Sequence, residues 1–491
     1  MTTVTEHTPR RRRNIEAVLL VLAVATSVVA YALTDAGSSG TWPAGLVGYG
    51  GGIAALAAVA HVALRLRAPY ADPMILPIAV TLNGLGLALI HRLDLATSSG
   101  FAVRQLMWAL VGMTLAVAVI WFLPDHRLLR RFTFTAMVLG FVLLLLPLLP
   151  GLGRTINGAR IWIRLGPMSF QPGEIAKIML AVFFAGYLVS QRDNLAMAGK
   201  RVLGLHLPRV RDLGPILIAW AASVGVLVMQ RDLGTSLLFF GLFVAMLYVA
   251  TERVSWIVIG ISLFLAGGVL AYTLFSHVQA RVTAWLDAMD NDVFNAERGG
   301  SYQLVQGLFG MANGGLTGTG LGQGMPHLVP YANSDFIFAT LGEELGLAGV
   351  MAVLCLYMML VERGIRTGIG VRDGFGKLLA GGLAFAIALQ VFVVVGGVTR
   401  VIPVTGLTLP LLAYGGSSLL SNWIIVALLL RISDAARRPA PALSGSGAPI
   451  ATDAVNVAAT QHIPQVPAGV GGPNASTGEP QTSRPGSGGP T

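Results

Sequence analysis

The stretch Leu233-Gly-Thr-Ser-Leu-Leu-Phe-Phe-Gly-Leu-Phe-Val-Ala-Met-Leu-Tyr-Val-Ala250 decides the fold class, because it contains no charged residue from end to end. An α-helix needs roughly 20 predominantly apolar residues to cross the hydrocarbon core of a bilayer. Within that core a helix satisfies its own backbone hydrogen-bonding groups, which a lipid-exposed irregular segment does not. The stretch therefore predicts a membrane-spanning helix.

The rest of the chain has the same character. Of its 491 residues 54% are hydrophobic and 11% are charged, and the mean hydropathy is +0.71. Soluble domains carry about a quarter charged residues, so this composition excludes a soluble globular enzyme. We expect an all-α polytopic membrane protein of about 12 transmembrane helices. The candidate spans lie near 15–33, 43–64, 73–91, 105–123, 132–150, 173–190, 213–229, 233–250, 254–275, 335–361, 378–399 and 408–430.

The basic residues predict the orientation of the chain, since lysine and arginine accumulate on the cytoplasmic side of membrane proteins. With the N-terminus in the cytoplasm, 22 of the 33 basic residues fall in cytoplasmic segments and nine in outer segments. No cleavage site follows the basic run 10–13, so we expect a retained first helix rather than a signal peptide. Both termini are therefore expected in the cytoplasm. The net charge of +10 reflects this orientation and does not indicate nucleic-acid binding.

Two long segments are not spans. Residues 434–491 are rich in proline, glycine, serine and alanine, a composition that predicts a disordered cytoplasmic tail. Residues 276–334 form a long outer loop, and loops of that length in a compact protein are usually functional. The single cysteine, Cys355, excludes a disulfide framework, and the eight histidines show no metal-ligand spacing.

The first candidate site is the stretch Gln171-Pro172-Gly173-Glu174-Ile-Ala-Lys177. Pro172 suits the first position of a helix, and Glu174 falls in the first turn, where the helix dipole favours an anion. Lys177 lies three residues further on, so the two charged side chains share one helix face. The spacing leaves two interpretations open, a local ion pair at a helix end or a charged patch at a membrane-embedded functional site.

The second candidate lies in the outer loop, at Arg281-Val-Thr-Ala-Trp285-Leu-Asp287. Its acidic residues could simply be solvated, and the spacing of Asp287, Asp290 and Asp292 lacks the glycine and distal glutamate of a calcium loop. A carboxylate beside an amphipathic Trp-Leu pair at the membrane interface could instead act as a general base on a lipid-linked substrate.

Further along the chain, Gly314-Gly-Leu-Thr-Gly-Thr-Gly-Leu-Gly-Gln-Gly324 matches neither the Walker nor the Rossmann pattern, so it does not indicate nucleotide binding. Asp335 and Glu343 are about two helical turns apart and are expected to line one wall of a cavity. Arg400-Val-Ile-Pro-Val-Thr-Gly-Leu-Thr-Leu-Pro410 leads into Tyr414-Gly-Gly-Ser417-Ser418. Such helix breakers at membrane depth are tolerated where the backbone lines a cavity or packs against protein.

Together these motifs resemble the SEDS family (shape, elongation, division and sporulation), whose members include RodA and FtsW. The resemblance covers about residues 73–432 and rests on five elements in the family's order. They are N-G-A-R-x-W-I with Q-P-G-E-x-x-K, then D-L-G-T-S at 232–236, W-L-D at 285–287, S-D-F-I-F with E-E-L-G, and P-V-T-G-L with Y-G-G-S-S. The chain departs from the family at Gly173, at Ala288 after W-L-D, and at Arg400, where a glycine is usual.

The resemblance implies a ten-helix bacterial peptidoglycan glycosyltransferase of the cytoplasmic membrane, similar to RodA more than to FtsW. It would polymerise lipid II beside a class B penicillin-binding transpeptidase, in elongation or division. It implies a basic N-terminus over 1–13, two additional helices over 14–72, and a core over 73–433. Two alternatives remain, a lipid II flippase and a non-enzymatic scaffold for the transpeptidase.

The resemblance also implies roles for individual residues. Asp287 would be catalytic, with Glu174 and Lys177 in support. Mg²⁺ or another divalent cation is a candidate to share the neutralisation of pyrophosphate, although the sequence contains no dedicated cage for it. The candidate substrate-binding residues are Arg104, Arg160, Arg164, Arg400, Asp335, Glu343 and Ser417.

Overall fold

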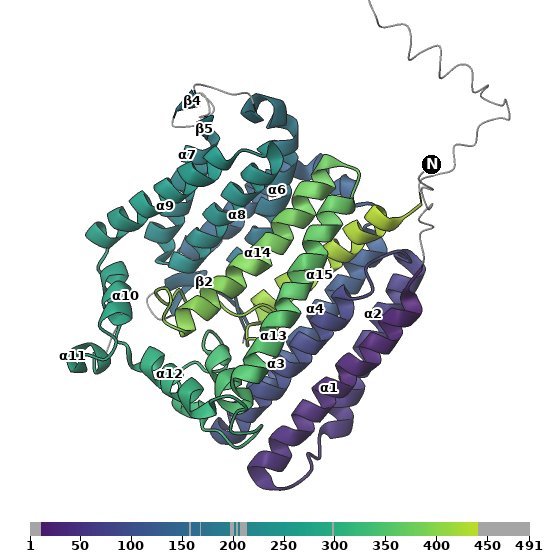
Figure 1. Ribbon diagram of the computed structural model, residues 1–491, viewed down its shortest axis with the longest axis vertical. Helices are drawn as coiled ribbons and strands as arrows, with labels where there is room; N and C mark the ends of the chain where they lie inside the picture. Colours follow the sequence, from purple (N-terminus) through teal and green to yellow (C-terminus); the bar gives the residue numbers. More distant parts are fainter. Residues whose placement is uncertain are drawn as a thin grey trace, which may run out of the picture. The chain divides into compact units, whose positions relative to one another are not determined.

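The computed structural model describes residues 11–156, 159–166, 168–196, 201–202, 205–206, 214–296 and 299–439 (Figure 1). In this part of the chain eleven helical segments are long and apolar enough to cross a membrane, which confirms the polytopic all-α prediction. They are α1 (Arg13–Ser39), α2 (Leu46–Arg67), α3 (Ile75–Thr97), α4 (Phe101–Phe122), α5 (Thr133–Leu145) with its flanking 3₁₀ turns η1 (His126–Phe132) and η2 (Leu146–Leu148), α6 (Pro172–Ala196), α8 (Leu233–Thr251), α9 (Val254–Leu274), α13 (Ile337–Gly370), α14 (Gly374–Val398) and α15 (Gly416–Arg437). The twelfth expected span, 213–229, corresponds to the shorter apolar helix α7 (Gly214–Gln230), which has 17 residues.

The segments between spans contain elements that were not predicted. The described part of residues 276–334, which we expected to form an outer loop, contains α10 (Ser276–Leu286), α11 (Asn291–Phe294), α12 (Tyr302–Gly314) and the turn η4 (Pro326–Leu328). Before α6, the strands β1 (Gly153–Ile156), β2 (Ala159–Leu165) and β3 (Met168–Phe170) form an antiparallel sheet in that order. A second pair, β4 (Arg201–Val202) and β5 (Leu205–His206), is antiparallel as well. Isoleucine alternates with arginine or tryptophan along β2, a pattern typical of a strand.

The start of α1 and the end of α15 lie at the same end of the bundle. Arg13, at the start of α1, donates to the carbonyl of Ala71, and Arg437, at the end of α15, pairs with Asp72. An even number of crossings is required to bring both ends together, which is consistent with counting α7 as a crossing. Helix α15 continues to Arg437, into the start of the expected tail, and residues 440–491 lie outside the described residues.

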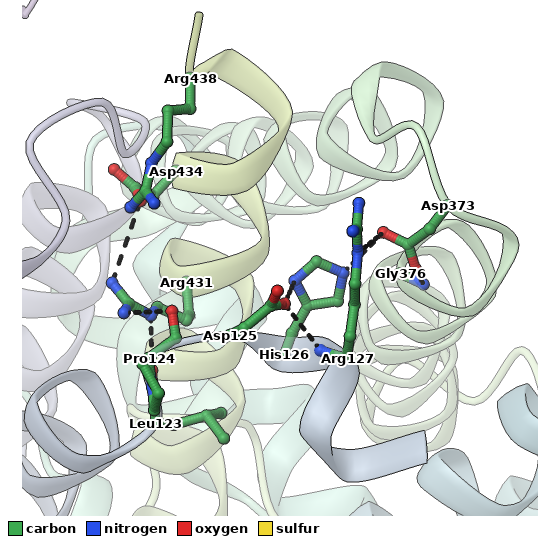
Figure 2. A network of polar contacts seen from close by, with 10 residues as sticks. All are labelled: Leu123, Pro124, Asp125, His126, Arg127, Asp373, Gly376, Arg431, Asp434 and Arg438. Carbon is green, nitrogen blue, oxygen red and sulfur yellow. Dashed lines mark hydrogen bonds and ion pairs between the residues drawn. The ribbon is translucent and has the colours of Figure 1, made fainter. Parts of the chain in front are cut away.

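A charged network ties this end of the bundle together (Figure 2). Arg431 of α15 donates to the carbonyl of Leu123 at the end of α4 (2.6 Å). Asp373 accepts from the Gly376 amide (2.7 Å) and so caps α14, and it also lies 2.9 Å from Nε2 of the buried His126 in η1. The network therefore joins α4, η1, α14 and α15. Its buried charged side chains have partners inside the protein, as buried charges require.

The expected span 408–430 begins later than predicted, because α15 starts only at Gly416 and residues 401–415 form an irregular segment between α14 and α15. Leu407, Leu409, Leu411 and Leu412 in this segment are buried, so its carbonyls need partners inside the protein. Side chains from four different helices supply them. These donors are Asn83 to Leu411 (3.3 Å), Gln105 to Ala413 (3.0 Å), Tyr357 to Pro410 (2.5 Å) and Gln390 to Thr408 (2.8 Å).

Candidate active site

Glu174 and Lys177 form a buried ion pair at the start of α6. The Lys177 ammonium donates to Glu174 Oε2 (2.8 Å) and to Gln390 Oε1 of α14 (2.9 Å), and the Ser421 hydroxyl of α15 donates to the same carboxylate (2.9 Å). Lys177 is only 1% exposed and Glu174 6%. The predicted spacing on one helix face therefore brings the two charges together. The pair also joins three helices, which a local pair at a helix end does not do.

A second charged cluster surrounds Arg281 of α10. Asp232, which caps α8 by accepting from the Gly234 amide (3.0 Å), and Asp335, which precedes α13, both interact electrostatically with Arg281. Burial raises the pKa of Asp335, and the Ser334 hydroxyl and the charge of Arg281 oppose this. Burial likewise lowers the pKa of Arg281, against the charges of the two aspartates. The cluster brings together the starts of α8 and α13 with α10.

Asp287 follows directly after α10 and is exposed to solvent. Its neighbours are held firmly, because Arg400 donates to the carbonyls of Trp285 (2.8 Å) and Leu286 (2.6 Å), and the Trp285 indole donates back to the carbonyl of Arg400 (3.1 Å). Arg281 adds a bond to the carbonyl of Val404 (2.9 Å). The end of α10 is thus cross-braced to the irregular segment.

The backbone at Arg400 explains why a glycine suits this position in the family. Its φ of 61° lies in the left-handed region, which a residue without a Cβ enters at no steric cost. In this chain Arg400 adopts that backbone conformation, and its guanidinium donates hydrogen bonds to two peptide carbonyls.

The irregular segment contacts both candidate sites. Gln390, which accepts from Lys177, also donates to the carbonyl of Thr408, and Arg400 contacts the end of α10. The buried pair and the exposed Asp287 carboxylate are therefore connected through residues 400–408.

The other predicted arginines lie nearer the surface. Arg104, in the first turn of α4, is exposed and donates to the carbonyl of Gly100 (3.1 Å). Arg164 on β2 is exposed and donates to Gly166 (3.1 Å). Arg160, also on β2, is partly buried and donates to the carbonyl of Pro147 (3.1 Å). Arg104 and Arg164 therefore present charge to solvent, whereas Arg160 connects the sheet to η2.

Glu343 and Ser417 are buried and engaged with the backbone. Glu343 Oε1 accepts from the Met325 amide (2.8 Å), and the Ser417 hydroxyl accepts from the Gln171 amide (2.8 Å) just before α6. Asp335 lies just before α13 rather than on it and interacts with Arg281, whereas Glu343 on α13 holds the segment that follows the glycine-rich stretch.

Sequence reasoning missed several residues that complete this arrangement. Gln390 lies in an otherwise apolar span, and Ser421 lies one turn into α15. Arg92 of α3 forms a buried ion pair with Glu344 (2.8 Å) and donates to the carbonyl of Gly324 (2.6 Å). The usable signal was a polar side chain inside an apolar run, since such groups in membrane spans are functional candidates by default.

Two further features bear on ligands. The described residues contain no group of three or more His, Cys, Asp or Glu side chains able to hold a metal ion, so they do not fit a dedicated magnesium cage. An apolar cavity of about 340 Å³ lies between α5, α6, α7 and α8. Its lining begins at Leu180, one turn along α6 from Lys177, and continues along that helix through Phe183, Phe184 and Tyr187.

Comparison with known proteins shows which family the chain resembles. A family model described as a cell cycle protein, for FtsW, RodA and SpoVE, matches residues 74–438. The peptidoglycan glycosyltransferase RodA of Mycobacterium tuberculosis (strain ATCC 25618 / H37Rv) is 49% identical over 435 residues, covering 87% of this chain and 92% of the relative. A probable peptidoglycan glycosyltransferase FtsW of Geobacter sp. (strain M18) is 32% identical, covering 74% and 96%.

Among solved structures, a chain of a peptidoglycan synthase complex that coordinates polymerization and crosslinking aligns with a TM-score of 0.50 at 28% identity. The alignment covers 79% of this chain and 96% of the other. The greater identity to the RodA relative than to the FtsW relative confirms the predicted branch. The chain belongs to the SEDS family.

Proposed function

We propose that this protein is a peptidoglycan glycosyltransferase that polymerises lipid II at the outer face of the cytoplasmic membrane. The observation that carries the proposal is Asp287, an exposed carboxylate at the end of a helix whose last residues are hydrogen-bonded to Arg400. The hydrogen bonds of the described residues leave this carboxylate free to accept a proton. Family membership and the activity named for the RodA relative support the same reaction.

The reaction is a single displacement that inverts the configuration of the donor sugar. The 4-hydroxyl of the acceptor attacks the anomeric carbon of the donor and forms a β-1,4 bond. The bond from that carbon to undecaprenyl pyrophosphate breaks, and the pyrophosphate leaves with the electron pair. Asp287 takes the proton of the attacking hydroxyl, and general-base help of this kind contributes about 10²–10⁴-fold to a rate.

Negative charge develops on the leaving pyrophosphate as the bond breaks. Its interaction with positively charged side chains therefore strengthens in the transition state. Arg104 and Arg164 are exposed, and we assign them to this role. Lys177 is buried and its ammonium is engaged by Glu174 and Gln390, so we assign the pair to holding the start of α6.

The apolar cavity supports a lipid-linked substrate. It runs along α6 from the level of Leu180, and its lining is almost entirely aliphatic and aromatic. A polyprenyl chain gains free energy by burying its methylene and methyl groups there, about 0.8 kcal/mol for each buried CH₂. The cavity thus suits the first isoprene units beyond the pyrophosphate.

Orientation and partner are parts of the same proposal. The ends of α1 and α15 lie together, and the basic residues favour the cytoplasmic side for both termini. Residues 276–334 would then face outward, where the substrate is presented. The similar chain from a peptidoglycan synthase complex supports a class B penicillin-binding protein as the partner, in cell elongation.

The test is gel-resolved polymerisation of labelled lipid II by purified protein, with and without the transpeptidase. We expect glycan ladders from the wild type and a loss of at least about 10²-fold in Asp287→Asn. Asp292→Asn is the matched control, since Asp292 is also an exposed acid of the outer loop. Because Asp287 is exposed, its replacement should leave expression and thermal unfolding unchanged.

Two results would contradict the proposal. Full turnover by Asp287→Asn would remove this residue from the role of base. If the wild type with its partner forms no ladders, the enzyme assignment fails, and transfer of lipid II across proteoliposome membranes would test the flippase alternative.

A further inference from the structure

The glycine-rich segment 315–324 is held between two helices that belong to different parts of the chain. On one side lies α13. There the Glu344 carboxylate accepts from the Gly322 amide (3.2 Å), and the backbone carbonyl of Glu344 accepts from the Gly320 amide (3.0 Å). On the other side lies the end of α1, one of two helices that precede the region matched by the family model.

The contact with α1 is a close approach of two backbones. A Cβ atom added to Gly37 would lie 2.0 Å from the carbonyl oxygen of Leu321. A Cβ added to Gly322, whose φ is 86°, would lie 2.4 Å from the carbonyl oxygen of Thr34 and 2.8 Å from the amide nitrogen of Ser38. Neither position has room for a side chain, so each glycine is required by the opposite backbone.

Polar side chains of α3 fix the geometry of this contact. His91 bonds Asp35 of α1 (2.9 Å), and its neighbour Arg92 forms the buried ion pair with Glu344 (2.8 Å). The Tyr31 ring of α1 stacks on His91 at 4.3 Å between centroids. Two adjacent residues of α3 therefore hold α1 and α13 on the two sides of the glycine-rich segment, and Arg92 also donates to the carbonyl of Gly324 (2.6 Å).

The segment leads directly to the candidate active site. After Gly324 the chain passes Met325, held by Glu343, and reaches Asn333, whose carbonyl accepts from the Tyr414 amide (2.8 Å). Asp335, two residues later, interacts with Arg281 of α10. The position of the glycine-rich segment thus sets where the following turn meets α10 and the residues before α15.

We propose that α1 is a strut for the outer loop, and that Gly37 and Gly322 are positioning residues for the polymerase reaction. The claim about turnover rests on the proposed function, whereas the claim about the contact does not. The strut holds residues 315–324 against α13 and so keeps Asp335 beside Arg281 of α10, the helix that Asp287 follows. The two added helices are then a working part of the outer site.

The test compares Gly37→Val with Gly48→Val in the full-length protein. Gly48 lies on α2 of the same helix pair and has open space around it, so valine there should be tolerated. We expect Gly37→Val to speed amide hydrogen exchange in residues 315–324 at least tenfold. We also expect it to lower kcat of lipid II polymerisation about tenfold with KM unchanged, because the strut does not touch the substrate.

The two readouts separate the possible failures. Unchanged exchange in Gly37→Val would overturn the strut, and faster exchange with unchanged kcat would overturn its role in turnover. If the wild type does not polymerise, the turnover claim falls with the proposed function, and exchange still decides the contact. If Gly37→Val does not fold, Asp35→Asn weakens the tie to His91 without adding volume, and the same outcomes apply.

Discussion

Replacing Arg400 by alanine tests whether this residue positions Asp287 or binds the pyrophosphate. The sequence placed Arg400 among the substrate-binding candidates, but its guanidinium donates to the carbonyls of Trp285 and Leu286, directly before the proposed base. The substitution removes both donors and leaves the Trp285 indole bond to the backbone of residue 400 in place. Asp287 itself is unchanged, so any loss must come from its position or from substrate binding.

The expected size of the effect follows from these two bonds. Hydrogen bonds from a charged donor contribute about 1.5–3 kcal/mol each, so their loss frees the end of α10 to shift. A displacement of about 1 Å at a reacting group costs on the order of 10²-fold in rate. We therefore expect kcat to fall about 10²-fold, which corresponds to about 2.7 kcal/mol in activation free energy. KM should stay the same, since no contact with the ground-state substrate is lost.

The assay is steady-state polymerisation of labelled lipid II, with Arg400→Gly and Arg164→Ala measured beside Arg400→Ala. Glycine also removes the guanidinium but suits the φ of 61°, so this variant should match alanine in kcat and be more stable by roughly 1 kcal/mol. Arg164→Ala should differ by raising KM as well as lowering kcat, since a cation on the pyrophosphate acts on the bound substrate and on the leaving group. A raised KM in Arg400→Ala would refute the positioning role and return Arg400 to the pyrophosphate.

Two further predictions concern buried charge. Lys177→Met leaves the Glu174 carboxylate buried without its cation and should cost about 3–5 kcal/mol of stability. This would appear as a lower thermal-unfolding temperature, and adding Glu174→Gln should recover most of the loss. Burial raises the pKa of Asp373, but the Gly376 amide and His126 outweigh it and hold the pKa below its usual value. The stabilisation is therefore present above about pH 4 and is lost as pH falls through the lowered pKa, so Asp373→Ala should cost about 1 kcal/mol at pH 7 and less at pH 3. An equal difference at both pH values would contradict this linkage.

The spans were predictable because length and apolar composition are local properties. The error at 408–430 has a physical cause, since residues 408–415 are buried or partly buried without being helical. The side chains that make this possible, such as Asn83 and Gln105, come from helices more than 300 residues away in sequence. The sheet over 153–170 was missed for a related reason, because its strands are short and depend on one another for pairing.

Some contacts of the candidate site could also be predicted from the sequence, and others could not. Glu174 and Lys177 are three residues apart on one helix, so their contact follows from helix geometry alone. The contacts of the residues before Asp287 do not follow from helix geometry. Arg400 and Trp285 are 115 residues apart in sequence and meet only when α10 packs against the irregular segment. The family resemblance predicted that Asp287 is catalytic, and the structure adds which contacts hold the residues before it.

The irregular segment and Arg400 before it connect the ion pair buried among helices with the end of the helix that Asp287 follows. Lys177 is held by Gln390, and Gln390 in turn holds the carbonyl of Thr408. Eight residues earlier, Arg400 holds the end of α10. A helix in place of this segment would satisfy its own carbonyls and leave Gln390 without that bond. The break in the helix is therefore what lets the membrane-embedded charges support the backbone that carries the proposed base.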